Sequence, residues 1–234
     1  MIRCTVLAYP NLGAEALNSP GDGFVAPEVF AEQMHYLANN GFSVISLSQL
    51  CDAFSGLTAL PDKAVVLTFE ADSEALRNHA VPVLHQLGFK ATAYVRQPPR
   101  NAVDRSQLWR ELGANGWTIA HDFGPDAWRF AVPSADPTRL VVDAKNRFEQ
   151  MLGRPVEHCG YAAGSFGGSG RRVLGSLGYR SGSSIAPGPG NWQIGPFMIR
   201  RVAVDGRDQV VRFGWKLWRI GSASASPGSV RQAA

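Results

Sequence analysis

Apolar strand patterns alternate with helical patterns along most of this chain, and this alternation constrains the fold more than any other feature. One such unit is the apolar run Val65–Phe69, which is followed by a helical segment over Glu74–Leu87 that ends at Gly88. The other predicted strands are Ile2–Tyr9, Phe42–Ser46, Ala91–Val95, Trp117–Ala120, Val156–Tyr161, Tyr179–Ser183 and Met198–Val204. The other predicted helices are Pro27–Asn40, Leu47–Phe54, Gln107–Asn115, Pro137–Leu152, Gly170–Leu177 and Asp208–Ile220.

This order of elements predicts an α/β protein. Strands separated by helices of about 10–15 residues are typical of parallel βα units, in either a barrel-like or an open sheet. No Pro-, Gly- or Ser-rich linker divides the pattern, so we predict a single domain over residues 1–220. Residues 221–234 are small and polar, which predicts a flexible tail.

Composition limits the class of protein. The chain has 234 residues and 45% hydrophobic residues, enough for one large core. It has no apolar run long enough to span a membrane and no signal-peptide pattern, so we expect a cytoplasmic protein that is not membrane-spanning. Cys4, Cys51 and Cys159 form no Cys-x-x-Cys pair, which favours buried thiols in a reducing compartment over a disulfide scaffold or a structural zinc site.

The positive charge of the chain is concentrated near its C-terminal end. The formal net charge is +4, and residues 200–219 account for it with six basic and two acidic side chains. Nucleic-acid binding usually needs a broader basic face, so we expect no nucleic-acid partner. The segment is interpreted as a solvated helix face, with an anionic surface or a protein partner bound through the basic helix at 207–220 as alternatives.

Carboxylates cluster where the strand Val65–Phe69 ends. Glu70 and Asp72 follow the strand directly, before the next helix begins. Catalytic groups of α/β proteins lie at the carboxyl ends of parallel strands. Glu70 and Asp72 are therefore the candidate catalytic residues.

Several segments resemble, in order and spacing, motifs of the polysaccharide deacetylase family, the nodulation-type (NodB-homology) carbohydrate esterases. Residues 66–73, V-L-T-F-E-A-D-S, are similar to the family's V-x-L-T-F-D-D-G. Residues 112–126 stand where the family has L-x-x-x-G-H-E-I-G-S-H-T-x-x-H, and residues 152–164 resemble L-G-x-P-V-x-x-F-A-Y-P-Y-G. Residues 79–95 and 177–181 also match, so the resemblance runs from about residue 3 to residue 219.

The resemblance implies a distorted (β/α) barrel whose site lies at the strand C-termini. In the family, the first Asp of T-F-D-D-G is the base, and the second Asp with the two His of H-x-x-x-H holds a divalent metal. That metal polarises the N-acetyl carbonyl, while backbone N–H groups near the P-Y-G tyrosine hold the oxyanion. The implied substrate-binding residues here are Tyr161 and Ala163, the latter through its backbone N–H. Trp192 is a further substrate-binding candidate, because its ring suits stacking on a sugar.

This chain departs from the family pattern at the metal-binding positions. Glu70 stands at the base, but Ala71 replaces the metal-binding Asp, and Asp122 and Asp126 replace the two His. Zinc prefers imidazole and thiolate, so a set of Asp122 and Asp126, with or without Asp72, suits Mg²⁺ or Ca²⁺ better. His121 is a substitute ligand only if the loop shifts by one residue. We predict a degenerate metal site without zinc, with another divalent cation as the alternative.

Ordinary structural roles are alternatives for several of these residues. Asp122 is suited to capping a turn before Gly124, and Glu70 is suited to being a satisfied carboxylate at a strand end. Trp215 and Trp218, like Trp192, suit stacking on a sugar ring. We favour their packing with Phe213, Leu217 and Ile220 to dock the last helix on the barrel.

The residues support more than one function. Our leading interpretation is a deacetylase-like protein with a degenerate site, which binds a carbohydrate or a partner in polysaccharide metabolism without zinc-dependent N-deacetylation. The alternative is a hydrolase of non-peptide C–N bonds in an amide, N-acetyl group or cyclic imide. That enzyme would work without zinc through Glu70, Asp72 and Asp122. A third hypothesis is a structural partner that docks through the basic helix.

Overall fold

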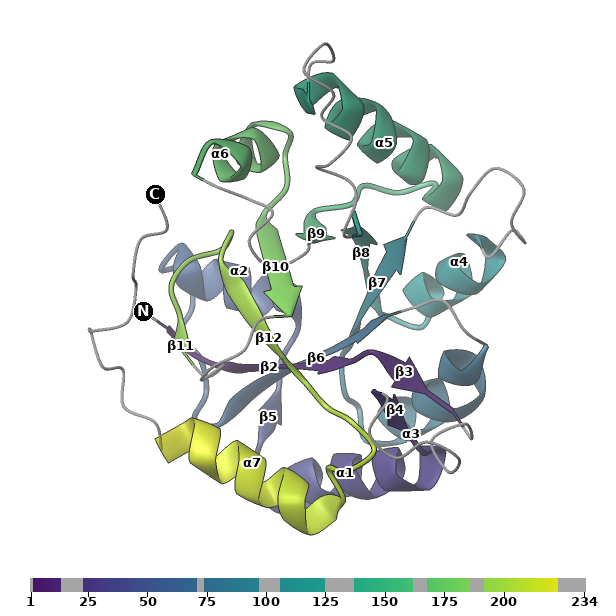
Figure 1. Ribbon diagram of the computed structural model, residues 1–234, viewed down its shortest axis with the longest axis vertical. Helices are drawn as coiled ribbons and strands as arrows, with labels where there is room; N and C mark the ends of the chain where they lie inside the picture. Colours follow the sequence, from purple (N-terminus) through teal and green to yellow (C-terminus); the bar gives the residue numbers. More distant parts are fainter. Residues whose placement is uncertain are drawn as a thin grey trace.

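Parallel strands close into a barrel. The structure is a computed structural model that describes residues 2–13, 23–70, 74–96, 106–124, 137–161, 168–185 and 192–222. Within them β2 (Thr5–Tyr9) pairs with both β6 (Ala64–Glu70) and β12 (Ile199–Ala203), which closes the ring. The ring continues through β10 (Ser181–Ile185), β9 (His158–Gly160), β8 (Thr118–Asp122) and β7 (Thr92–Arg96), as Figure 1 shows. The predicted barrel is confirmed, and the open sheet is excluded.

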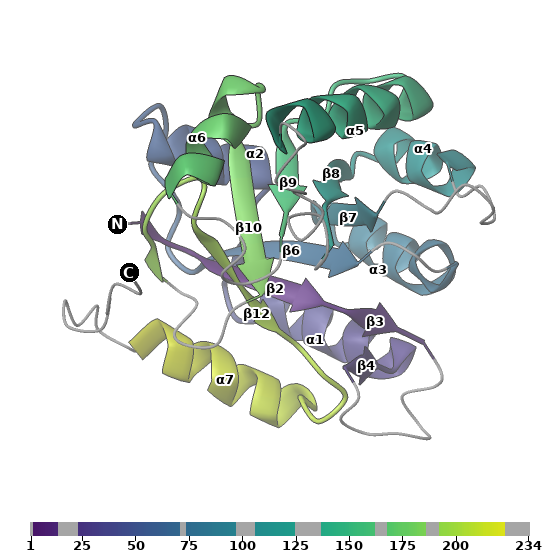
Figure 2. The ribbon, with the colours of Figure 1, turned by 45° about the horizontal axis from the view of Figure 1, so that its top comes forward.

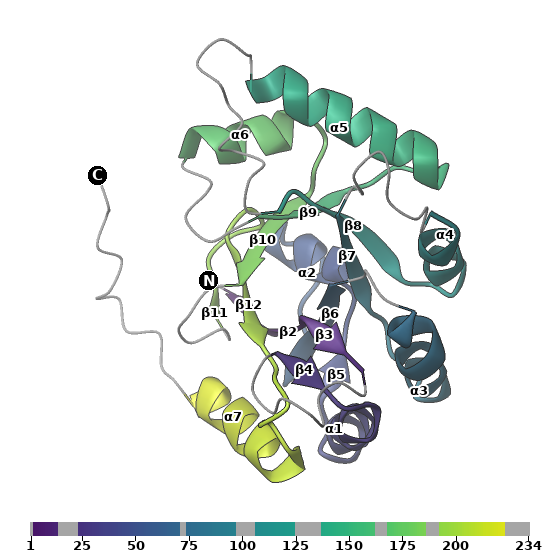
Figure 3. The same cartoon turned by 45° about the vertical axis from the view of Figure 1, so that its right-hand side comes forward.

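Helices surround this barrel on its outside (Figures 1 and 3). They are α1 (Pro27–Asn39), α3 (Val81–Gln86), α4 (Ser106–Ala114), α5 (Pro137–Leu152), α6 (Gly168–Ser176) and α7 (Val210–Ser222), whereas α2 (Leu47–Phe54) packs against the barrel interior. Figure 2 shows α7 beside α1, on the side of the barrel away from α5 and α6. In the described part of the chain no helix is long and apolar enough to cross a membrane.

Alternation along the strands separates two apolar clusters. Val66, Tyr94 and Ile199 point into the barrel, where Leu47 and Leu50 of α2 join them. Residues of the opposite parity, such as Leu67 and Phe69, pack against the surrounding helices. Because successive side chains of a strand point to opposite faces, Glu70 shares the inward face of β6 with Val66. The cysteines Cys4, Cys51 and Cys159 are buried and free, as predicted.

Two helical predictions differ from the structure. The segment predicted as one helix over Glu74–Leu87 begins with a π-helical turn, η2 (Leu76–Ala80), before α3 starts at Val81. Pro82 has no N–H to donate to the carbonyl of Asn78, which disfavours a continuous α-helix there. Helix α7 continues to Ser222, two residues past its predicted end at Ile220, and residues 223–234, the rest of the predicted tail, lie outside the described part.

The last helix docks through fewer side chains than predicted. Phe213, Leu217 and Ile220 are buried, as expected, and Gly214 faces the ring of Tyr36 on α1. Trp215 and Trp218 are 56% and 66% exposed. Their predicted role in docking α7 is therefore wrong, because helical periodicity places them on the face opposite the buried stripe.

Short strand pairs outside the barrel were not predicted. β1 (Ile2–Arg3) pairs antiparallel with β11 (Trp192–Gln193), and β3 (Asn11–Leu12) pairs with β4 (Phe24–Val25). β5 (Ser43–Val44) extends the main sheet by pairing with the start of β6, and it lies within the strand predicted over Phe42–Ser46. β1 lies within the strand predicted over Ile2–Tyr9. Two-residue strands are too short to show a sequence period, which is why the pattern gave no sign of most of them.

Candidate active site at the barrel mouth

Polar side chains gather where the barrel strands end. Glu70 and Asp122 are the last residues of β6 and β8, and Arg96 is the last residue of β7 between them. The strand register aligns Arg96 with Asp122 and Glu70 with Tyr94. Strand order and register thus bring these side chains to one end of the barrel, the mouth where the sequence predicted a site.

Glu70 forms an ion pair with an arginine of β12, which lies on the other side of β2 from β6. The Nη1 atom of Arg201, in β12, lies 2.6 Å from Oε1 of Glu70. The Arg201 side chain is only 4% exposed, and its guanidinium lies over the ring of Tyr94, 4.0 Å from the ring centroid. Burial raises the pKa of Glu70, and the positive charge of Arg201 opposes that rise. The interpretation of Glu70 as a satisfied carboxylate at a strand end is confirmed.

Both oxygens of Asp122 are engaged. Nε and Nη2 of Arg96 lie 3.1 and 2.7 Å from Oδ2, and Oδ1 accepts a hydrogen bond of 3.0 Å from the backbone N–H of Gly124. Asp122 is 8% exposed, whereas the Arg96 side chain is 61% exposed. The interpretation of Asp122 as the cap of the turn at Gly124 is confirmed.

His121 faces away from this mouth. Its ring stacks on Phe148 of α5, with centroids 4.9 Å apart, and Nδ1 lies 3.1 Å from the hydroxyl of Tyr179. Burial lowers the pKa of His121 to about 4. Because His121 and Asp122 have opposite parity in β8, the imidazole packs between barrel and helix and does not replace a ligand in the mouth.

The remaining predicted site residues are only partly visible. The hydroxyl of Tyr161 donates a 2.6 Å hydrogen bond to the carbonyl of Phe197, and its ring belongs to the helix-facing cluster. Asp72, Asp126 and Ala163 lie outside the described residues. For Trp192 the structure gives the backbone, which pairs with Arg3 in β1. The catalytic and substrate-binding roles of these residues stay predictions.

Sequence reasoning missed the two arginines of the mouth. Arg201 was counted within the basic segment 200–219, and Arg96 follows the predicted strand Ala91–Val95 by one residue. An arginine inside a predicted buried strand is the signal that marks Arg201, since an unpaired charge there is costly. The Nε–H of Arg201 is buried and has no hydrogen-bond partner among the described residues.

Among the described residues, the charges at the mouth are balanced. Two carboxylates, Glu70 and Asp122, face two guanidinium groups, Arg201 and Arg96, and Ser183 donates a 2.7 Å hydrogen bond to the hydroxyl of Tyr94 below them. Within the described residues no three His, Cys, Asp or Glu side chains are grouped closely enough to hold a metal ion. The visible groups offer paired charges and hydrogen-bond donors and acceptors to a ligand.

Comparisons of sequence place these residues in a wider context. A family model described as polysaccharide deacetylase matches residues 58–182. The poly-β-1,6-N-acetyl-D-glucosamine N-deacetylase of Escherichia coli (strain K12) is 33% identical over 67 residues, which cover 29% of this chain and 10% of that protein. The chain therefore matches only about a tenth of that relative's length. The putative polysaccharide deacetylase YxkH of Bacillus subtilis (strain 168) is 21% identical over 199 residues, covering 83% of this chain and 71% of YxkH.

Solved structures show the same fold. The Streptococcus pyogenes deacetylase PplD, in complex with acetate, superposes with a TM-score of 0.74 at 19% identity and covers 92% of this chain and 98% of its own. IcaB from Ammonifex degensii superposes with a TM-score of 0.70 at 18% identity, over 93% of this chain and 98% of its own. At such identities the likeness concerns the barrel, and the chemistry of the mouth depends on the residues described above.

Proposed function

This chain belongs to the polysaccharide deacetylase family, and on that premise we propose that it binds a carbohydrate at the barrel mouth without zinc-dependent N-deacetylation. The observation that carries the proposal is the pairing of Asp122, which stands at the position of a metal ligand, with Arg96. Glu70, the other carboxylate described at the mouth, is paired with Arg201. A carboxylate held by a guanidinium has its charge compensated and its lone pairs engaged, so it is a poor metal ligand.

The donors at the mouth do not fit zinc. Asp122 stands where the family has a ligating histidine, yet Arg96 and the N–H of Gly124 engage both of its oxygens. Ala71 has no ligating atom, and His121 packs against α5. Zinc binding would require Asp122 to release Arg96, and it would gain only oxygen ligands in a site that normally uses imidazole.

The same groups suit a sugar. The guanidinium of Arg96 is held on one side by Asp122, and the Arg96 side chain is 61% exposed, so a ligand at the mouth can reach it. Sugar hydroxyls both donate and accept, so they can bind such donors and the neighbouring carboxylates together.

Calorimetric titration with N-acetylglucosamine oligomers, β-1,4- and β-1,6-linked, tests the proposal when acetate release is measured in the same samples. The expected result is saturable binding without acetate. Arg96→Ala should weaken the affinity about tenfold or more, because a charge-assisted hydrogen bond is lost. Arg147→Ala, at an exposed position on α5, is the matched control. Failure of every oligomer to bind would overturn the proposal.

A second candidate is a hydrolase of non-peptide C–N bonds that uses Glu70 as a general base. The observation in its favour is the raised pKa of Glu70, since a buried carboxylate of raised pKa is a better base near neutral pH. Acetate release from the oligomers, or ring opening of a cyclic imide, that is lost in Glu70→Gln would favour this enzyme over simple binding. Activity that survives Glu70→Gln would exclude Glu70 as the base.

A further inference from the structure

Helix α7 is amphipathic, but the described structure covers only one of its faces. The buried face carries Phe213, Leu217 and Ile220. The outer face carries Val211, Trp215 and Trp218, which are 82%, 56% and 66% exposed. Their spacing of four and three residues places these side chains in one stripe along the helix. Two exposed tryptophans on one stripe are a large apolar surface for a helix that faces solvent.

The charge of this helix has one sign. Residues 209–222 contain Arg212, Lys216 and Arg219 and no acidic residue. The nearest carboxylate in the sequence is Asp208. Its side chain is only 1% exposed and is paired with Lys216 at 2.5 Å and with Arg212 at 3.3 Å. The guanidinium of Arg219 lies over the ring of Trp215, 5.4 Å from the centroid. The outer face therefore combines tryptophan rings with basic groups and offers no negative charge of its own.

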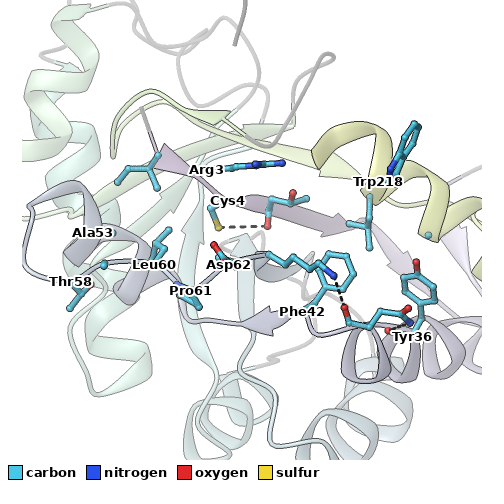
Figure 4. Close-up of a pocket in the computed structure, with 18 residues that line it drawn as sticks. Arg3, Cys4, Tyr36, Phe42, Ala53, Thr58, Leu60, Pro61, Asp62 and Trp218 are labelled. Carbon is cyan, nitrogen blue, oxygen red and sulfur yellow. Dashed lines mark hydrogen bonds between the residues drawn. The ribbon is translucent and has the colours of Figure 1, made fainter. Parts of the chain in front are cut away.

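A cavity adjoins this face at the far end of the barrel from the mouth, and its lining mixes apolar side chains with charged ones, among them Arg3, Asp62 and Lys63. It has a volume of about 800 Å³ and lies between α7, α1 and the first residues of β1 and β6. Figure 4 shows Trp218 at its edge, with Phe42 and Leu60 among the labelled lining residues. The cavity lies at the amino ends of the strands, whereas Glu70 and Asp122 lie at the carboxyl ends.

We propose that the outer face of α7 docks on the surface of a membrane that contains anionic phospholipids. Tryptophan rings favour the headgroup level of a bilayer, where an apolar body and a polar N–H are both satisfied. Basic residues beside them are attracted to anionic lipid headgroups. Charge complementarity selects this occupant, because the stripe of Val211, Trp215 and Trp218 is flanked by cations. The proposal does not depend on what binds at the mouth.

Flotation of the purified full chain with vesicles tests this docking. Phosphatidylcholine vesicles that contain phosphatidylserine should bind the protein, and vesicles of phosphatidylcholine alone should bind it much more weakly. Binding should fall as salt is added, because screening weakens charge attraction. The affinity of the double variant Trp215→Ala/Trp218→Ala for these vesicles should be lower by about tenfold or more, since two interfacial anchors are lost. Arg219→Gln should weaken binding about fivefold.

The control is Arg147→Gln, which removes one exposed arginine from α5 on another side of the barrel and should leave vesicle binding unchanged. Thermal unfolding checks that each variant is folded. Equal binding to both vesicle types, or none to either, would overturn the proposal. Two further outcomes would overturn the proposal by giving the face another partner. One is that the wild type binds a neutral oligosaccharide and the double tryptophan variant does not. The other is that the wild type is a dimer in gel filtration and the double tryptophan variant is a monomer.

Discussion

Arg201 shows what a single residue adds to this site and why the sequence did not identify it. Arg200 and Arg201 are adjacent in a predicted strand, so one side chain must point into the barrel and the other outward. The composition of the segment does not say which. The structure answers through Ile199, which lies in the interior cluster and shares parity with Arg201. Glu70 could be proposed from its position at a strand end, but its partner comes from a strand 131 residues away.

Removing Arg201 should destabilise the fold through Glu70. Arg201→Met keeps the apolar stem but leaves a largely buried carboxylate unpaired, which should lower the free energy of unfolding by about 2–4 kcal/mol. Urea denaturation at neutral pH measures this. In the double variant Arg201→Met/Glu70→Gln the loss should be smaller than the sum of the two single losses, because neither charge is left alone. Strictly additive losses would contradict the ion pair.

Buried histidine should make the protein sensitive to acid. Burial lowers the pKa of His121 from 6.5 to about 4, so the fold favours neutral imidazole. The resulting stability is fully present above pH 6.5 and is lost as the pH falls towards 4. His158 is buried with its pKa lowered to about 4 as well. Because the unfolded state binds a proton at each histidine more readily than the folded state, each should lower the free energy of unfolding by about 2–3 kcal/mol between neutral pH and about pH 4.5.

Replacing one buried histidine separates the two contributions. His121→Phe preserves the ring that stacks on Phe148 but cannot be protonated, so the acid-induced loss of stability should fall by about half. Urea denaturation at neutral and acidic pH measures this loss in wild type and variant. His79→Phe, at an exposed position on η2, controls for the removal of a histidine. An unchanged acid loss in His121→Phe would show that other groups cause it.

At the scale of elements, local signals were sufficient where they were strong. Helix α5 spans Pro137–Leu152, as predicted, because its stripe is long and Gly153 follows it. Helix α2 begins at Leu47, after the N-cap residue Ser46, whose side chain forms a capping box with that of Gln49. The prediction differed where tertiary context decides. The π-helical turn η2 precedes Pro82, and β3 and β4 are ordered by pairing with each other.

Strand β9 depends on a position without a side chain. A Cβ on Gly160 would lie 2.8 Å from the Tyr94 ring and 3.4 Å from Nη2 of Arg201. Gly160→Ala should therefore displace the ring beneath Arg201 and lower the free energy of unfolding by about 1–3 kcal/mol. Gly195→Ala is the control, because no heavy atom lies within 4 Å of its added Cβ. Chemical denaturation of both variants measures the difference, and equal costs would contradict close packing at Gly160.

At the scale of the whole molecule, closure of the barrel decides where the site forms. The N-terminal strand β2 lies between β6 and β12, so segments from both ends of the chain complete the ring. Periodicity predicted parallel βα units but allowed an open sheet, because it contains no information on long-range pairing. The family resemblance supplied the barrel. The sequence was enough to predict that the site lies at the carboxyl ends of the strands. It could not predict the arginine pairs, because they depend on how the strands pair and on the closure of the barrel.

Zinc should not stabilise this protein, and restoring the family pattern should change that. The midpoint of thermal unfolding of the wild type should be the same with zinc and with a chelator, since Arg96 and Arg201 already compensate the mouth carboxylates. The variant Ala71→Asp/Asp122→His/Asp126→His regains one carboxylate and two imidazoles. Zinc at about a hundred times its dissociation constant would stabilise that variant by about 2.7 kcal/mol, or roughly 5–10 °C for a chain of this size.

The control for that comparison is Asp122→Asn, which removes the same carboxylate without supplying an imidazole and should not respond to zinc. A zinc-dependent midpoint in the wild type would overturn the non-zinc proposal, because it would show that the residues already present form a metal site. A triple variant that folds and ignores zinc would contradict the explanation that the substitutions at positions 71, 122 and 126 are what prevent zinc binding.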